Sequence, residues 1–217
     1  MDKTFWQQKW EENDIGFHGS SANPLLVQYF NELSLAKGSR VFVPLCGKSL
    51  DIHWLLSNGY RVAGAELSKI AVEQLFAELG VEPVVSRSGE VEQYRAKNID
   101  IFRGDIFDLS PEMLGPVDAI YDRAALVALP EDMRARYTEH LLAITDIAPQ
   151  LLICFEYDQS LMDGPPFSIR DKEVHRHYCD RYHLTLLASE DIPGGLKGRC
   201  AAKEKVWLLK AVSLSES

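Results

Sequence analysis

The sequence predicts a doubly wound α/β fold built around one mostly parallel sheet. Short apolar runs at residues 41–43 and 61–66 are strand-like, and each is followed by an amphipathic helical pattern. Continuous apolar runs are typical of strands buried on both faces, and strand–helix–strand repeats pair in parallel with right-handed crossovers. The chain has 217 residues, 46% of them hydrophobic, and no linker divides it. We therefore expect a single domain, residues 1–217.

Start and stop signals delimit the individual elements. Asn23 caps a predicted helix that ends at Gly38. Ser49 and Ser68 cap the next two helices, and a longer helix begins at Pro130 with acidic residues in its first turn. The predicted strands are 41–43, 61–66, 99–103, 117–121, 150–155, 183–189 and 205–212.

The last part of the chain has a different pattern. The final two predicted strands are joined by a loop that contains Gly194, Gly195 and Gly198. This arrangement predicts an antiparallel pair that closes one edge of the sheet. Residues 84–97 are ambiguous in pattern and are assigned to neither a helix nor a strand.

Charge and cysteine content exclude several classes of protein. A formal net charge of -9 and a pI of about 5.2 argue against binding duplex nucleic acid or an anionic membrane. The four cysteines contain no C-x-x-C pair, and no apolar run approaches the roughly 20 residues that cross a bilayer. His175 and His177 point to different sides of a predicted helix, which disfavours a metal site there. We expect a cytoplasmic protein that is monomeric and binds no metal.

Residues 44–49 follow the first buried strand and open a helix, which is where ligands bind in doubly wound folds. Gly47-Lys48-Ser49 resembles the tail of a phosphate loop, but the position five residues before Gly47 is Phe42 rather than glycine. A dinucleotide site needs three spaced glycines, and only Gly47 is present. A nucleoside ligand without phosphates needs only a tight turn, and S-adenosylmethionine is the obvious candidate.

Two acidic strand ends support a nucleoside ligand. Glu66 ends the second predicted strand, where an acid accepts hydrogen bonds from ribose hydroxyls; a solvated strand end is the alternative. Residues 105–108 follow the third predicted strand. They combine acids, backbone amides and apolar side chains, which suits an adenine ring; a plain loop is the alternative.

Several motifs together resemble those of the thiopurine S-methyltransferase family. They are F-V-P-L-C-G-K-S at 42–49, V-A-G-A-E-L-S at 62–68, Y-D-R-A-A-L at 121–126, K-V-W at 205–207, and Trp6, Lys9-Trp10 and Phe17-His18 near the N-terminus. Tyr121 stands where the animal proteins have tryptophan. The resemblance covers nearly the whole chain. It implies a class I methyltransferase fold, Rossmann-like and doubly wound, with a seven-stranded sheet whose last strand is antiparallel.

The resemblance also implies which residues bind ligands. Trp10, Leu45, Glu66, Ile106 and Arg123 match positions that contact the co-substrate, S-adenosyl-L-methionine. From the residues alone, core packing is the favoured role of Trp10, because it shares a helical face with another tryptophan four positions earlier and large aromatic side chains usually pack in cores. Arg123 is likewise compatible with a local ion pair to its neighbouring acid.

On the substrate side, the resemblance points to Phe17 and Lys203. Phe17 belongs to the N-terminal segment, residues 1–20, which is expected to close as a lid over the active site. Lys203 falls near an arginine of mammalian relatives, so the cation is kept but the planar guanidinium is lost. Arg123 and Asp122 are the catalytic candidates.

The predicted function is S-methylation of thiopurines and other aromatic or heterocyclic thiols. Sulfur displaces the methyl group of S-adenosyl-L-methionine in line and leaves S-adenosyl-L-homocysteine, with no covalent enzyme intermediate. The expected partner is a small thiol, without nucleic acid or membrane. Methylation of selenium or tellurium species by the same fold, and a non-enzymatic nucleoside-binding module, are the alternatives.

Overall fold

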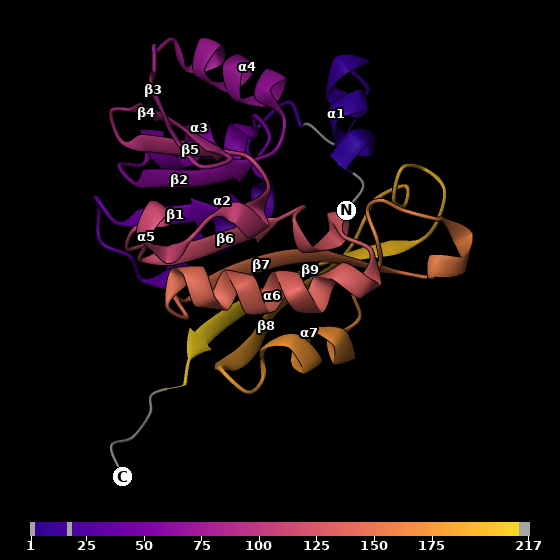
Figure 1. The fold of residues 1–217 in the computed structure, drawn as a ribbon. Coiled ribbons are helices and arrows are strands. Elements are labelled where there is room, and N and C mark those ends of the chain that lie inside the picture. Colours follow the sequence, from indigo (N-terminus) through magenta and orange to yellow (C-terminus); the bar gives the residue numbers. More distant parts are fainter. Residues whose placement is uncertain (1–2, 17–18, 213–217) are drawn as a thin grey trace.

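The computed structural model describes residues 3–16 and 19–212. Its strands form one sheet in the order β3-β4-β5-β2-β1-β6-β7-β9-β8 (Figure 1). The strands are β1 (Arg40–Val43), β2 (Arg61–Glu66), β3 (Val84–Ser88), β4 (Val91–Ala96), β5 (Ile99–Arg103), β6 (Ala119–Arg123), β7 (Gln150–Tyr157), β8 (Tyr182–Asp191) and β9 (Ala202–Ala211). The five central strands, from β5 to β7, pair in parallel, whereas the two strands at each edge are antiparallel to their neighbours.

Helices cover both faces of this sheet. The α-helices are α1 (Lys3–Glu11), α2 (Pro24–Tyr29), α3 (Leu50–Ser57), α4 (Lys69–Leu79), α5 (Pro111–Leu114), α6 (Glu131–Thr145) and α7 (Asp171–Tyr178). Short 3₁₀ helices are η1 (Phe30–Leu33), η2 (Ile106–Asp108), η3 (Leu126–Ala128) and η4 (Gln159–Leu161). Figure 1 shows α6 and α7 side by side across one half of the sheet. None of the helices within 3–16 and 19–212 is long and apolar enough to cross a membrane.

Alternating strand residues build two cores on opposite faces. Tyr137 of α6 and Val174 of α7 belong to one apolar cluster, together with Ile120 of β6. Tyr121, the next residue of β6, belongs to the other cluster with Ile52 of α3. Because side chains alternate along a strand, β6 presents successive residues to different layers of the molecule.

The predicted α/β fold with an antiparallel closing strand is confirmed, and so are most of the helix caps. The Asn23 side chain accepts hydrogen bonds from the backbone N–H groups of Leu25 and Leu26, and the Ser68 hydroxyl accepts one from Ala71. Gly80 ends α4 in the left-handed conformation, with φ of 67°.

The main differences from the prediction are three. The sheet has nine strands rather than seven, because the ambiguous residues 84–97 form the β3–β4 hairpin, which pairs with β5. Every residue of β3 is exposed, so no buried face marks it as a strand. The helix after Asn23 ends early, because Ser34 already takes the left-handed conformation with φ of 54°, before Gly38 does so with φ of 86°. Strand β6 covers Ala119–Arg123 rather than 117–121, which brings Arg123 onto the strand itself.

Candidate active site

The turn after β1 has an unusual backbone that brings it close to β2. Leu45 and Gly47 both have positive φ, of 47° and 52°, and the Cys46 N–H donates to the Ala65 carbonyl at 2.9 Å. A Cβ on Gly64 would lie 2.8 Å from the Cys46 sulfur, so only glycine fits beneath the turn. A non-glycine residue such as Leu45 in this region is strained, and such strain is concentrated at functional sites.

The Glu66 carboxylate lies at the end of β2 beside this turn. One of its oxygens accepts the Gly47 N–H at 2.8 Å, and the other accepts the Ser68 N–H at 2.7 Å. Burial raises the pKa of Glu66, while these backbone hydrogen bonds oppose the rise. A carboxylate offers about four acceptor positions, so Glu66 retains acceptor capacity for a bound diol.

A cavity of about 180 Å³ opens next to Glu66. Leu45, Glu66 and Ile106, three of the residues expected to bind the cofactor, all line it. Three further parts of the chain complete its wall: the end of β2, the segment after β5, and α6. Their lining residues are Ala65, Leu67, Gly104, Asp105, Phe107, Met133 and Arg136. The mixture of apolar walls with the carboxylates of Glu66 and Asp105 suits a nucleoside.

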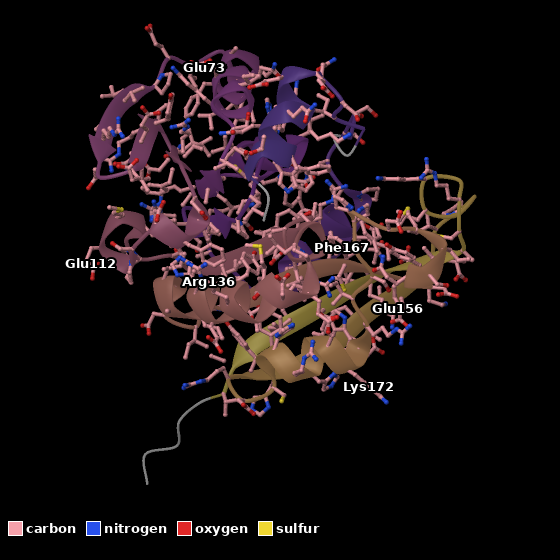
Figure 2. All side chains as sticks on the ribbon, turned by 45° about the vertical axis from the view of Figure 1, so that its right-hand side comes forward. Glu73, Glu112, Arg136, Glu156, Phe167 and Lys172 are labelled. Carbon is pink, nitrogen blue, oxygen red and sulfur yellow. The ribbon has the colours of Figure 1, made fainter. Side chains whose placement is uncertain are left out.

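Met133 and Arg136 are not among the residues that the sequence predicts for this site. Both project from the first half of α6, and Arg136 (labelled in Figure 2) lies with its guanidinium carbon 3.9 Å from the centre of the Phe107 ring. Their spacing of three residues places them on one helical face, and this spacing is the sequence feature that could have grouped them. No local motif shows that this face looks toward η2 rather than solvent.

Trp10 brings α1 onto the same turn. Trp10 is 5% exposed, and a Cβ on Gly47 would lie 3.1 Å from its ring, which therefore covers the glycine. Figure 1 shows α1 beside α4, and the two helices are in contact. Trp6 is half-buried on the same helix. Phe17 lies outside the described residues.

Arg123 ends β6, two strands away from β2. Its side chain is 24% exposed, and Nη1 lies 3.9 Å from an Asp51 carboxylate oxygen. Asp51 is buried in the first turn of α3, where it also accepts the Tyr121 hydroxyl at 3.0 Å and the Asn23 N–H at 2.7 Å. Arg123 is thus held at the carboxyl edge of the parallel strands, which is the edge that carries Glu66.

Asp122 and Lys203 are not part of this cavity. The Asp122 carboxylate faces α6, where it accepts the Tyr137 hydroxyl at 2.7 Å and the Leu126 N–H at 3.2 Å, and burial raises its pKa to about 6. Lys203 on β9 is 48% exposed and pairs with Asp191 at 3.1 Å. Asp122 and Arg123 are adjacent on a strand, so they point to opposite faces of the sheet.

Comparison with known proteins identifies the family. The family model described as "Thiopurine S-methyltransferase (TPMT)" matches residues 1–212. The chain belongs to the thiopurine S-methyltransferase family. It is 58% identical over 211 residues to a thiopurine S-methyltransferase of Xanthobacter autotrophicus, with 97% of this chain and 99% of the relative covered. A thiopurine S-methyltransferase of Teredinibacter turnerae is 54% identical, with 96% and 97% covered. The chain is accordingly an S-adenosyl-L-methionine-dependent methyltransferase.

Solved structures agree with this fold. A 1,6-didemethyltoxoflavin-N1-methyltransferase of Burkholderia thailandensis, solved with bound S-adenosylhomocysteine, superposes with a TM-score of 0.65 at 14% identity and covers 96% of this chain and 87% of its own. Magnesium protoporphyrin IX methyltransferase of Synechocystis, also with bound S-adenosylhomocysteine, gives 0.62 at 13% identity, with 96% and 100% covered. Across residues 3–16 and 19–212, no group of three or more histidine, cysteine or acidic side chains is placed to hold a metal ion.

Proposed function

We propose that this methyltransferase acts on the sulfur of small aromatic and heterocyclic thiols, thiopurines among them. The observation that carries the proposal is the separation of two polar groups along one edge of the sheet. The Glu66 cavity lies at the end of β2, and Arg123 lies at the end of β6, with β1 between them. Adjacent strands are about 4.8 Å apart, so the two groups are separated by about 10 Å.

The cavity has the features that the nucleoside of S-adenosyl-L-methionine requires. Glu66 would accept the ribose hydroxyls, and Ile106 would lie against adenine, with Leu45 at the turn. Trp10 above Gly47 supports the proposal that residues 1–20, Phe17 included, close over the ligand and exclude water. When bound, the co-substrate supplies an activated methyl group on a positively charged sulfur.

Arg123 has two tasks in this proposal. It would contact the co-substrate, and its fixed charge would favour the thiolate form of the nucleophile and hold it near the methyl group. Orientation of this kind supplies roughly 7–11 kcal/mol in well-aligned reactions. Asp122 faces the opposite layer, so we assign it to positioning β6 rather than to contact with substrate. Lys203 would meet the outer end of a substrate.

We further infer a monomeric, cytoplasmic enzyme whose partners are small molecules. The net charge of -9 does not suit binding to a nucleic acid or to an anionic membrane surface.

The test is product formation by the purified protein. S-adenosyl-L-methionine is mixed separately with 6-mercaptopurine, thiophenol, an alkyl thiol and selenite, and S-adenosylhomocysteine is quantified by mass spectrometry. We expect S-adenosylhomocysteine and methylated product in equal amounts, fastest with the aromatic and heterocyclic thiols. Turnover with selenite alone would move the substrate class to selenium, and cofactor binding without any turnover would leave a nucleoside-binding module.

A further inference from the structure

A buried polar network joins five side chains under the start of α2. We call Asn23, Asp51, Tyr121, Arg123 and Glu204 the α2 network. The Asn23 backbone N–H donates to Asp51, and its side-chain amide donates to Glu204 Oε1 at 3.3 Å. Asp51 also accepts the Tyr121 hydroxyl and lies near Arg123. Residues up to 181 positions apart in the chain thus meet at one place.

The two acids of the α2 network are in different states. Asp51 is 2% exposed, accepts two hydrogen bonds and lies beside Arg123, so its carboxylate is shielded from an incoming ligand. Glu204 is half-buried, and its one hydrogen bond within the described chain comes from Asn23. The neighbouring lysines of β9 are paired elsewhere: Lys203 with Asp191, and Lys205 with Glu156 and Asp171. Glu204 is therefore the more accessible of the two acids and the one with fewer hydrogen bonds.

The surroundings of Glu204 make it a stronger base than an exposed glutamate. The charged groups facing it are Arg123 from β6, Asp51 from α3 and Glu190 from β8. Burial is the largest influence and raises the pKa of Glu204; Glu190 and Asp51 act in the same direction, and Asn23 and Arg123 oppose them. A carboxylate whose pKa lies nearer neutrality accepts a proton more readily from a weak acid.

The position of Glu204 fits the geometry of methyl transfer. In-line displacement requires the nucleophile to approach from the side opposite the leaving sulfur. The nucleoside cavity lies on the β2 side of β1, so the nucleophile must lie on the side of β6, β7 and β9. Arg123 is in register with Ile153 of β7. Glu204 is in register with Phe155, which lies two residues further along the same strand. It therefore lies beyond Arg123 at the same edge.

We propose that Glu204 is the proton acceptor for thiols that arrive protonated, with Asn23 holding its carboxylate and Arg123 steadying the sulfur. This proposal rests on the proposed function. The S–H proton passes to the Glu204 carboxylate, and the sulfur electron pair forms the new S–CH₃ bond. The electrons of the broken bond to methyl stay on the leaving cofactor sulfur, and Glu204 then returns its proton to solvent. Thiols that are already ionised need only Arg123, so the role of Glu204 depends on substrate acidity.

The test is kinetics of Glu204→Gln on a series of ring-substituted thiophenols and benzyl thiols that differ in acidity. Glutamine keeps an oxygen for Asn23 but accepts no proton. We expect kcat/KM to fall about 100-fold for benzyl thiols and to change little for thiols that are ionised at the assay pH. The wild-type rate with benzyl thiols should level off above the pKa of Glu204, whereas the variant rate should keep rising until the thiol itself ionises.

Matched controls separate this role from charge loss and from misfolding. Glu139→Gln removes an exposed acid of α6 that does not face Glu204, and it should leave the dependence on thiol acidity unchanged. Melting temperature and S-adenosylhomocysteine affinity of Glu204→Gln should match those of the wild type. Equal losses for acidic and weakly acidic thiols, or an unchanged pH profile, would overturn the proposal. Failure of the proposed function looks different, because then the wild type itself turns over no thiol.

Discussion

The two sides of the β1 turn hold their charged groups in different ways. On the β2 side, the Glu66 carboxylate is fixed by backbone N–H groups of Gly47 and Ser68. On the β6 side, Arg123 and Glu204 are held by other side chains of the α2 network. Backbone donors stay in place when nearby side chains change, whereas a side-chain network is altered by a single substitution. The β2 side is thus suited to the cofactor, which is the same in every reaction. The β6 side is suited to thiol substrates, which differ from one another in their contacts.

The largest effect should follow from removing the central cation of the β6 side. We expect Arg123→Ala to lower kcat/KM by about 100-fold or more, because a fixed charge near the reacting atoms is lost. The loss should be greatest for thiols that bear an anionic group. Steady-state kinetics on paired neutral and anionic thiols measure this difference.

Arg123→Lys is the matched variant, with melting temperature as the folding control. It should recover only part of the rate, since a point charge replaces a planar fork. If neutral and anionic thiols lose rate equally, Arg123 serves the cofactor alone and the division between the two sides fails.

On the β2 side, Glu66→Ala should weaken binding of S-adenosylhomocysteine by about tenfold to a hundredfold. The ribose hydroxyls lose a charged acceptor, and hydrogen bonds to charged groups contribute roughly 1.5–3 kcal/mol. Calorimetric titration gives the dissociation constant, and Glu32→Gln, an exposed acid in η1, is the control. If folded Glu66→Ala protein binds S-adenosylhomocysteine with unchanged affinity, the proposal that Glu66 binds the ribose is wrong.

The covering of the turn by α1 provides a third test. Hydrogen exchange of residues 3–16 should slow when S-adenosylhomocysteine binds, by up to about 100-fold at a ligand concentration 100 times the dissociation constant. In Trp10→Ala the slowing should be smaller, because the ring no longer covers Gly47. Equal exchange with and without ligand would show that α1 merely packs against the fold.

The smallest effect on ligand binding is expected for Asp122. Its pKa is raised from 3.8 to about 6 by burial, so the folded state holds this proton at a higher pH than the unfolded chain. Relative to Asp122→Asn, the wild type should lose stability as pH rises from about 4 to 7, by at most about 3 kcal/mol. Urea unfolding at several pH values measures this difference. A stability difference between the two proteins that does not change with pH would contradict the placement of Asp122. A large loss of S-adenosylhomocysteine affinity in the variant would also contradict it.

The β2 side could be predicted from the sequence because its signals are local. The cap at Ser68 and the strand end at Glu66 lie within a few residues of the groups that they contact. Asp122 was predicted to be catalytic together with Arg123, its neighbour in the Y-D-R-A-A-L motif, although side chains of adjacent strand residues point to opposite faces.

The β6 side and the outer wall of the cavity depend on contacts between distant parts of the chain. Glu204 meets Asn23 across 181 positions, and Arg136 meets Phe107 only after α6 has folded across η2. No local pattern encodes such meetings. The β3–β4 hairpin escaped prediction for another reason: its outer strand buries no face, so its hydrophobic pattern carries no signal.

The most direct test of the division between the two sides is a crystal structure with S-adenosylhomocysteine and a thiol substrate. We predict the ribose hydroxyls on Glu66, adenine between Ile106 and the α6 side chains, and the thiol sulfur on the β6 side, between Arg123 and Glu204. A ribose bound away from Glu66, or a thiol on the β2 side of the turn, would contradict the account.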